Sequence, residues 1–112
     1  MPGKDKSDLL QGTLDMLVLK VVAVEPLHGY AIAQRIGQIS QALLHVPQGS
    51  LYPALHRLEN KGWLAATWQQ TDAGRDTKVY RLTAKGRRQL DDEVAEWARV
   101  SQGIQLILST TE

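Results

Sequence analysis

Apolar positions recur with a helical period in the middle of this 112-residue chain. Spacings of four and three place one stripe of leucines along a helix: Leu51, Leu55 and Leu58. Ser50 is suited to cap this helix, and Pro53 then lies within the first turn, where its missing N–H has no partner to lose. Gly62 suits the left-handed position that ends a helix, with Trp63 placed to contact Leu58 in a Schellman-type cap. The pattern predicts a helix with one buried side and one free side.

The free side of this helix carries side chains suited to DNA. Tyr52, His56 and Arg57 lie on it, and Gln48 and Ser50 lie near its start. They supply hydrogen-bond donors, an aromatic ring and a fixed positive charge, which are groups that contact phosphates and base edges. We therefore interpret residues 48–62 as a recognition helix.

Two further helices are predicted before this segment. Thr13 is expected to cap the first helix, whose apolar residues lie on almost every side, so that both its own core and a second subunit are candidates to cover it. This helix should stop at Glu25, because the residue before a proline is pushed out of the helical region. The next helix spans about 29–40 and carries a stripe of isoleucines: Ile32, Ile36 and Ile39. The second and third helices form a helix-turn-helix arrangement.

After Gly62 the apolar period changes to that of a β-hairpin. Strands are predicted over 63–70 and 78–82 by apolar residues at alternate positions: Leu64, Ala66, Trp68, Tyr80 and Leu82. A hairpin directly after a recognition helix is a wing. Arg75 and Lys78 would lie at or near its tip, suited to a phosphate or a minor-groove contact. The alternative is that these charges belong to an ordinary solvated turn.

The last helix is predicted to begin after a Thr83 cap and to run to about Leu108. A seam with the period of a coiled coil follows it: Leu90, Val94, Trp97, Ser101, Ile104 and Leu108. Because three helices and a hairpin already use the internal faces of so small a domain, we expect the seam to pack against a second copy of the chain. The alternative is that the helix folds back on its own domain.

Trp97, in the middle of this seam, has two interpretations. Plain packing at the dimer interface is favoured, because the helix offers no obvious polar anchor for a ligand. The other interpretation is contact with a small aromatic effector, since a large flat side chain near a two-fold axis can stack on an aromatic molecule held between subunits.

Charge and composition narrow the class of protein. The net charge is +1, but residues 1–90 carry +5 and residues 91–112 carry −4, so the basic part coincides with the expected DNA-facing elements. No apolar run approaches the roughly 20 residues that span a bilayer, and no signal-type segment follows the N-terminus. We expect one cytoplasmic domain without a membrane partner.

The sequence shows no catalytic or metal-binding set. It contains no cysteine, and its three histidines, His28, His45 and His56, lack a paired metal-ligand spacing. We therefore expect no enzyme, no cofactor and no metal. The rival function is a winged-helix module that binds another protein and not DNA. The polar and aromatic free side of residues 48–62 argues against it, because a protein-binding groove would present apolar anchors.

Several stretches of the sequence resemble the PadR family of bacterial transcriptional regulators. They are Leu-Leu-Gln-Gly-Thr-Leu-Asp-Met-Leu-Val-Leu from Leu9, His-Gly-Tyr from His28, Gly-Ser-Leu-Tyr-Pro-Ala-Leu from Gly49, Leu-Glu-Asn-Lys-Gly from Leu58 and Tyr-Arg-Leu-Thr-Ala-Lys-Gly from Tyr80. Their combination is specific and covers about residues 9–108. The resemblance implies a mainly α fold with a β-hairpin wing (α+β), in which a winged helix-turn-helix is followed by a C-terminal dimerisation helix.

The resemblance also assigns roles along the chain. Residues 1–8 form a flexible arm, 9–82 the DNA-binding domain and 83–112 the dimerisation helix. The single C-terminal helix resembles the small subclass of the family. DNA contacts fall on Ser50, Tyr52, Arg57 and the wing from Arg75 to Lys78, and dimer contacts come from the first and last helices, with Leu14 and Leu17 in the first. Such a homodimer binds operator DNA, which we expect to be an inverted repeat, and usually represses.

Overall fold

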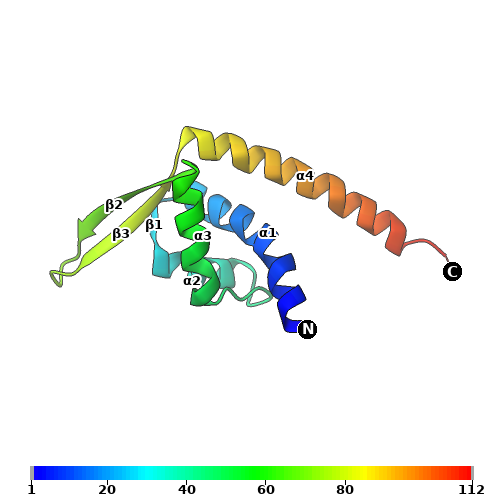
Figure 1. Cartoon of the computed structure of the whole chain (residues 1–112), viewed down its shortest axis with the longest axis horizontal. Helices are drawn as coiled ribbons and strands as arrows, with labels where there is room; N and C mark the ends of the chain where they lie inside the picture. The colour runs from blue at the N-terminus through cyan, green and yellow to red at the C-terminus, as the bar shows by residue number, and fades with distance from the viewer. Residues whose placement is uncertain (1, 112) are drawn as a thin grey trace.

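The computed structural model describes the backbone of residues 2–111 and the side chains of residues 12–111. The elements follow in the order α1 (Pro2–Val24), β1 (Leu27–His28), α2 (Gly29–Ile39), α3 (Gln48–Asn60), β2 (Leu64–Gln70), β3 (Asp76–Leu82) and α4 (Ala84–Leu108). Figure 1 shows the β2–β3 hairpin projecting on one side and α4 reaching past the opposite side. The predicted fold class, a mainly α winged helix with a hairpin wing, is confirmed.

Helix α1 begins earlier than predicted. It starts at Pro2, so Thr13 lies inside the helix and does not cap it, and the segment expected to be an arm is helical from Pro2 onward. Proline is favoured at the first helical position, where it has no intrahelical hydrogen bond to lose. The prediction relied on apolar periodicity, and the polar residues before Leu9 carry none.

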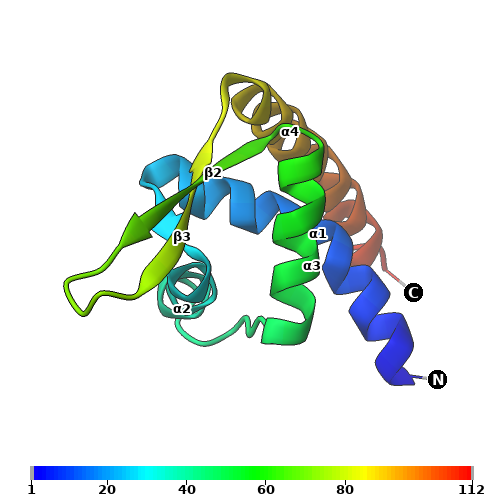
Figure 2. The ribbon, with the colours of Figure 1, turned by 60° about the vertical axis from the view of Figure 1, so that its left-hand side comes forward.

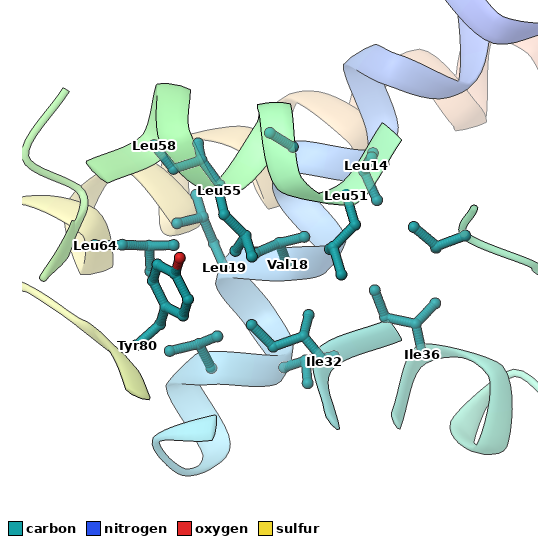
Figure 3. Packing of buried hydrophobic residues seen from close by; sticks show 14 of the residues in the cluster. Leu14, Val18, Leu19, Ile32, Ile36, Leu51, Leu55, Leu58, Leu64 and Tyr80 are labelled. Atoms are coloured by element: carbon teal, nitrogen blue, oxygen red, sulfur yellow. The ribbon is translucent and has the colours of Figure 1, made fainter. Parts of the chain in front are cut away.

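The leucine stripe of α3 forms the centre of the core. Leu51, Leu55 and Leu58 have 0% of their surface exposed, as predicted. They point toward α1 and α2, where Val18, Leu19, Ile32 and Ile36 lie, and toward Leu64 and Tyr80 of the sheet (Figure 3). Full burial of one such side chain contributes about 1.5–3 kcal/mol. The predicted isoleucine stripe of α2 is wrong at its end, because Ile39 is the last residue of that helix and is exposed.

The two ends of α3 differ in how well they were predicted. The N-cap is Pro47 and not Ser50, so Pro53 lies beyond the first turn. The C-terminal end agrees with the prediction, because Gly62 has a φ of +78°. The N–H of Trp63 donates to the carbonyl of Leu58 and that of Gly62 to the carbonyl of Glu59, each at 3.0 Å. These two bonds define a Schellman motif.

The wing belongs to a three-stranded antiparallel sheet in the order β1-β3-β2. Both hairpin strands were predicted, but β1 was not, because two residues are too few to show alternation. Leu27 and His28 of β1 pair with Tyr80 and Val79 of β3, which ties the start of α2 to the wing. Trp68 lies where the hairpin has left the core and is exposed.

Helix α4 starts at a crowded junction with the end of α3. The Thr83 hydroxyl accepts from the N–H of Gly86 at 2.9 Å, which confirms the predicted cap, and donates to the carbonyl of Gly62 at 2.6 Å. A Cβ at Gly86 would overlap the carbonyl oxygen of Trp63, so this position requires glycine. The first half of α4 packs on α1 through Leu90, and the second half extends beyond the core (Figure 1).

Candidate nucleic-acid interface

The outer side of α3 is a continuous exposed surface. The buried residues of the helix are Leu51, Ala54, Leu55 and Leu58. At 3.6 residues per turn the centre of the opposite side is a ridge formed by Gly49, Pro53, His56 and Asn60, all exposed. We call these four residues the outer ridge. Among the described side chains, none forms a hydrogen bond or an ion pair with His56 or Asn60. Sequence reasoning found His56 and missed Asn60, although its spacing of four from His56 could have indicated it.

Tyr52 lies on the flank of α3 that faces α2. It is half-exposed, and its ring packs over Gly29, where an added Cβ would lie 3.0 Å from the Tyr52 Cε1 atom. Gln48 and Ser50 are exposed in the first turn. Three of the predicted α3 contacts therefore surround the N-terminal half of the outer ridge.

Arg57 lies on the other flank, against α1. Its Nη2 atom is 2.9 Å from the Oδ1 atom of Asp15, and the two side chains are 34% and 18% exposed. The expectation that Arg57 stands opposite the leucine stripe is therefore corrected, since it points sideways and is held by an acid.

Lys78 lies on strand β3 and not at the tip of the wing. Its Nζ atom is 3.0 Å from the Oε1 atom of Glu59 on α3, and it stands 5.4 Å from the ring centre of Tyr80. The hydrogen bond to Glu59 raises the pKa of Lys78. Lys78 thus joins the wing to α3.

Arg75 occupies the tip of the wing, as predicted. The turn is closed by the Thr71 N–H, which donates to the Arg75 carbonyl at 2.8 Å, and Gly74 takes a φ of +80°. The Arg75 side chain is exposed and makes no ion pair with any side chain of residues 12–111. Figure 2 shows the wing leaving the C-terminal end of α3 and projecting away from that helix.

The predicted dimer residues separate into two groups. Leu14 and Leu90 are buried in the core of this same chain, so the expectation that they contact a partner is corrected. Leu17 is partly buried against the core. The exposed fractions of Val94, Trp97, Ile104 and Leu108 are 46%, 50%, 50% and 73%, and Ser101 lies among them. Only this outer part of the seam is left to contact another molecule.

Trp97 also lines a hollow between α1 and α4. The hollow measures about 290 Å³, and Met16, Val100, Glu93 and Glu96 share its wall. Burial raises the pKa of the Glu93 carboxyl, and its Oε2 atom has no hydrogen-bond partner among the described residues.

No helix in the described part of the chain is both long and apolar enough to cross a membrane. Residues 12–111 contain no group of three His, Asp or Glu side chains placed to hold a metal ion.

Comparison with known proteins identifies the family. A model of the transcriptional regulator PadR-like family matches residues 18–92. The chain belongs to this family. A Lysinibacillus sphaericus protein is 31% identical over 107 residues, which are 96% of this chain and 98% of that protein. A transcriptional regulator of Mycobacterium tuberculosis is 37% identical over 76 residues, 68% of this chain and 67% of that one.

The three-dimensional likeness to PadR-like proteins extends over nearly the whole chain. The crystal structure of a PadR family transcriptional regulator from Eggerthella lenta superposes with a TM-score of 0.82 at 32% identity, covering 97% of this chain and 93% of that one. This PadR-like protein is accordingly a DNA-binding transcriptional regulator, in a family of regulators and not of enzymes.

Proposed function

We propose that this PadR-like regulator binds an inverted-repeat operator as a homodimer and represses transcription from it. The observation that carries the proposal is the exposed outer side of α3 together with a wing whose tip carries Arg75, which is exposed and has no ion pair among the described side chains. A recognition helix in the major groove with a charged hairpin against the adjacent backbone is the docking that such an arrangement supports.

The proposed DNA contacts come from both elements. Gln48, Ser50, Tyr52 and His56 would meet bases and phosphates from α3, and Arg75 would meet a phosphate from the wing. The remaining two predicted contacts, Arg57 and Lys78, are each paired with an acid.

The homodimer is supported by the exposed apolar part of α4. Large exposed apolar patches mark interaction surfaces. Two copies paired through the seam would hold two recognition helices at a fixed separation. Reading successive major grooves on one face of B-DNA requires a separation of roughly 34 Å, and the two-fold symmetry makes the operator an inverted repeat.

A gel-shift titration tests the DNA contacts. We expect Tyr52→Ala and His56→Ala to weaken binding to a duplex selected from a randomised library by the parent protein, by about tenfold each. Arg75→Ala should weaken selected and random duplexes by similar factors, because a phosphate contact positions the protein without reading bases. Arg99→Ala, on exposed α4, is the matched loss of one positive charge and should change neither.

The salt dependence of duplex affinity distinguishes DNA binding from the rival function, which is binding to another protein. Counterion release makes the affinity for any duplex fall steeply as salt rises. A parent protein that binds no duplex at low salt would instead favour a winged-helix module for protein partners.

Repression is tested with a reporter. A promoter that carries the selected duplex should give lower output when the parent protein is present, and Tyr52→Ala should relieve that effect. Higher output with the parent protein would identify an activator.

A further inference from the structure

Two ion pairs hold the recognition helix from opposite flanks. Arg57 joins α3 to α1 through Asp15 at 2.9 Å, and Glu59 joins α3 to the wing through Lys78 at 3.0 Å. Arg57 and Glu59 are two positions apart, so they leave the helix about 200° apart around its axis. The two pairs therefore contact α3 within one turn and from nearly opposite directions.

The pairs connect α3 to elements that are themselves fixed. Asp15 follows the buried Leu14 on α1, and Lys78 is registered opposite Trp68 by the β2–β3 ladder. The Lys78 ammonium also lies 5.4 Å and 6.0 Å from the ring centres of Tyr80 and Trp68. Each link thus runs from a defined place on the scaffold to a defined place on the helix.

Both cations are poorly placed to bind a phosphate. Each lies at hydrogen-bond distance from a carboxylate, which offsets the field that a phosphate would feel and occupies a donor that it would need. Neither belongs to the outer ridge, whereas His56 and Asn60 do. The polar side chains of the outer ridge are therefore His56 and, at the last residue of α3, Asn60.

We propose that Arg57 and Lys78 are positioning residues, which act through Asp15 and Glu59 to fix the rotation of α3 about its axis, and that Asn60 reads bases together with His56. A clockwise or anticlockwise turn of the helix would replace the outer ridge by one of its flanks. An Asn side chain can pair with both N6 and N7 of adenine, and residues four apart on a helix lie side by side. This inference rests on the proposed DNA binding and deepens it.

The structure also predicts where the effect of breaking the pairs should appear. Partly exposed ion pairs contribute little to the free energy of unfolding. Their loss should therefore leave the melting temperature nearly unchanged and reduce the discrimination between the selected duplex and random DNA.

A double-mutant cycle on Asp15 and Arg57 tests the first link in the full-length chain. We expect Asp15→Asn, Arg57→Gln and the double variant each to lower the ratio of affinities for selected and random duplex by the same factor, about tenfold. The slope of log affinity against log salt should not change in any of them. If Arg57 bound a phosphate, Asp15→Asn would instead tighten both duplexes and Arg57→Gln would reduce that slope by about one.

The wing pair gives an independent cycle. Glu59→Gln, Lys78→Gln and their combination should reproduce the equal losses of discrimination, although Glu59→Gln removes a negative charge near the DNA. Tighter binding by Glu59→Gln on both duplexes, with additive effects of Lys78→Gln, would contradict the positioning role. Asn60→Ala should relax the base preference at one position of each half-site. An unchanged base preference in this variant would refute the proposed base reading by Asn60.

Arg99→Gln is the charge-matched control for both cycles. Arg99 pairs with Glu96 inside α4 and does not contact α3, so its loss should alter neither the ratio nor the slope. A parent protein that selects no duplex overturns the proposed function and this inference with it. A parent that selects one, with additive cycles and reduced slopes, overturns this inference alone.

Discussion

The leucine stripe of α3 and the seam of α4 have the same kind of apolar spacing but opposite surroundings. Leu51, Leu55 and Leu58 are 0% exposed, whereas Trp97 and Ile104 are each 50% exposed. Helix α3 lies among α1, α2 and the sheet, whereas the second half of α4 extends beyond the core. An apolar period therefore indicates that a side of a helix is built to be covered, and it does not indicate which molecule covers it.

The largest effect on the free energy of unfolding should follow from truncating a leucine of the buried α3 stripe. Leu55→Ala removes a fully buried side chain and should lower the free energy of unfolding by about 2–5 kcal/mol, because the lost transfer energy adds to the cost of the cavity. Urea titration followed by circular dichroism measures it. Leu106→Ala, the same change at an exposed position of α4, should stay within about 0.5 kcal/mol. Equal losses of unfolding free energy in Leu55→Ala and Leu106→Ala would contradict the difference between the buried stripe of α3 and the exposed positions of α4.

A smaller effect should follow from trimming the open seam. Ile104→Ala should raise the dissociation constant of the dimer about tenfold, which corresponds to an interface residue worth more than 1 kcal/mol, and leave the unfolding of dilute monomer unchanged. Sedimentation velocity over a range of concentrations measures this constant. Leu106 lies on the opposite side of α4, so Leu106→Ala should leave it unchanged. A dimer weakened equally by both variants would mean that another side of α4 makes the contact.

Trp97→Ala separates packing from sensing at the same seam. We expect the dimer to dissociate about tenfold more readily, as befits a large interface aromatic side chain. An intact dimer that no longer releases DNA on addition of an inducing aromatic compound would identify Trp97 as the effector contact. An intact dimer with unchanged release would remove Trp97 from both roles.

The smallest effect concerns Glu93 of α4, which lines the hollow between α1 and α4. Because burial raises the pKa of Glu93 above its ordinary value of 4.5, the folded chain holds a proton there more tightly than the unfolded chain does. Its contribution to stability therefore falls as the pH rises from about the ordinary pKa through the raised one, and the loss is complete above that. Glu93→Gln should be slightly more stable than the parent at neutral pH and equal to it at acid pH. Melting curves at several pH values would contradict this if the difference did not depend on pH.

The sequence predicted the fold because local signals and buried stripes agreed. The Schellman end at Gly62, the Thr83 cap and the leucine stripe each depend on residues close in the chain, which a pattern can show. The partners of Arg57 and Lys78 could not be predicted in this way. Asp15 lies 42 positions from Arg57, and Glu59 lies 19 positions from Lys78, so only the packing of α1 and the wing against α3 reveals that these cations are engaged.

The errors at the helix starts have a different origin. Ser50 has the right chemistry for a cap but lies inside a helix that begins at Gln48, and Thr13 lies inside one that begins at Pro2. Capping preferences are statistical and weak beside the propagation of a helix that tertiary packing holds. Asn60 lay within the predicted helix, four positions after His56, but was not assigned to its free side.

At Thr83 the start of α4 is held directly against the residues that end α3. Thr83 bonds the carbonyl of Gly62 and the N–H of Gly86, and Gly86 lies against the Trp63 backbone, so no flexible linker separates the two helices. The 25 residues of α4 extend about 37 Å from this point at 1.5 Å per residue. A rotation of α4 by about 10° about this junction would move the C-terminal end of the helix by roughly 6 Å. In the proposed homodimer, a small change in the angle at which two α4 helices cross would therefore change the direction of the two α3 helices, because the junction is rigid.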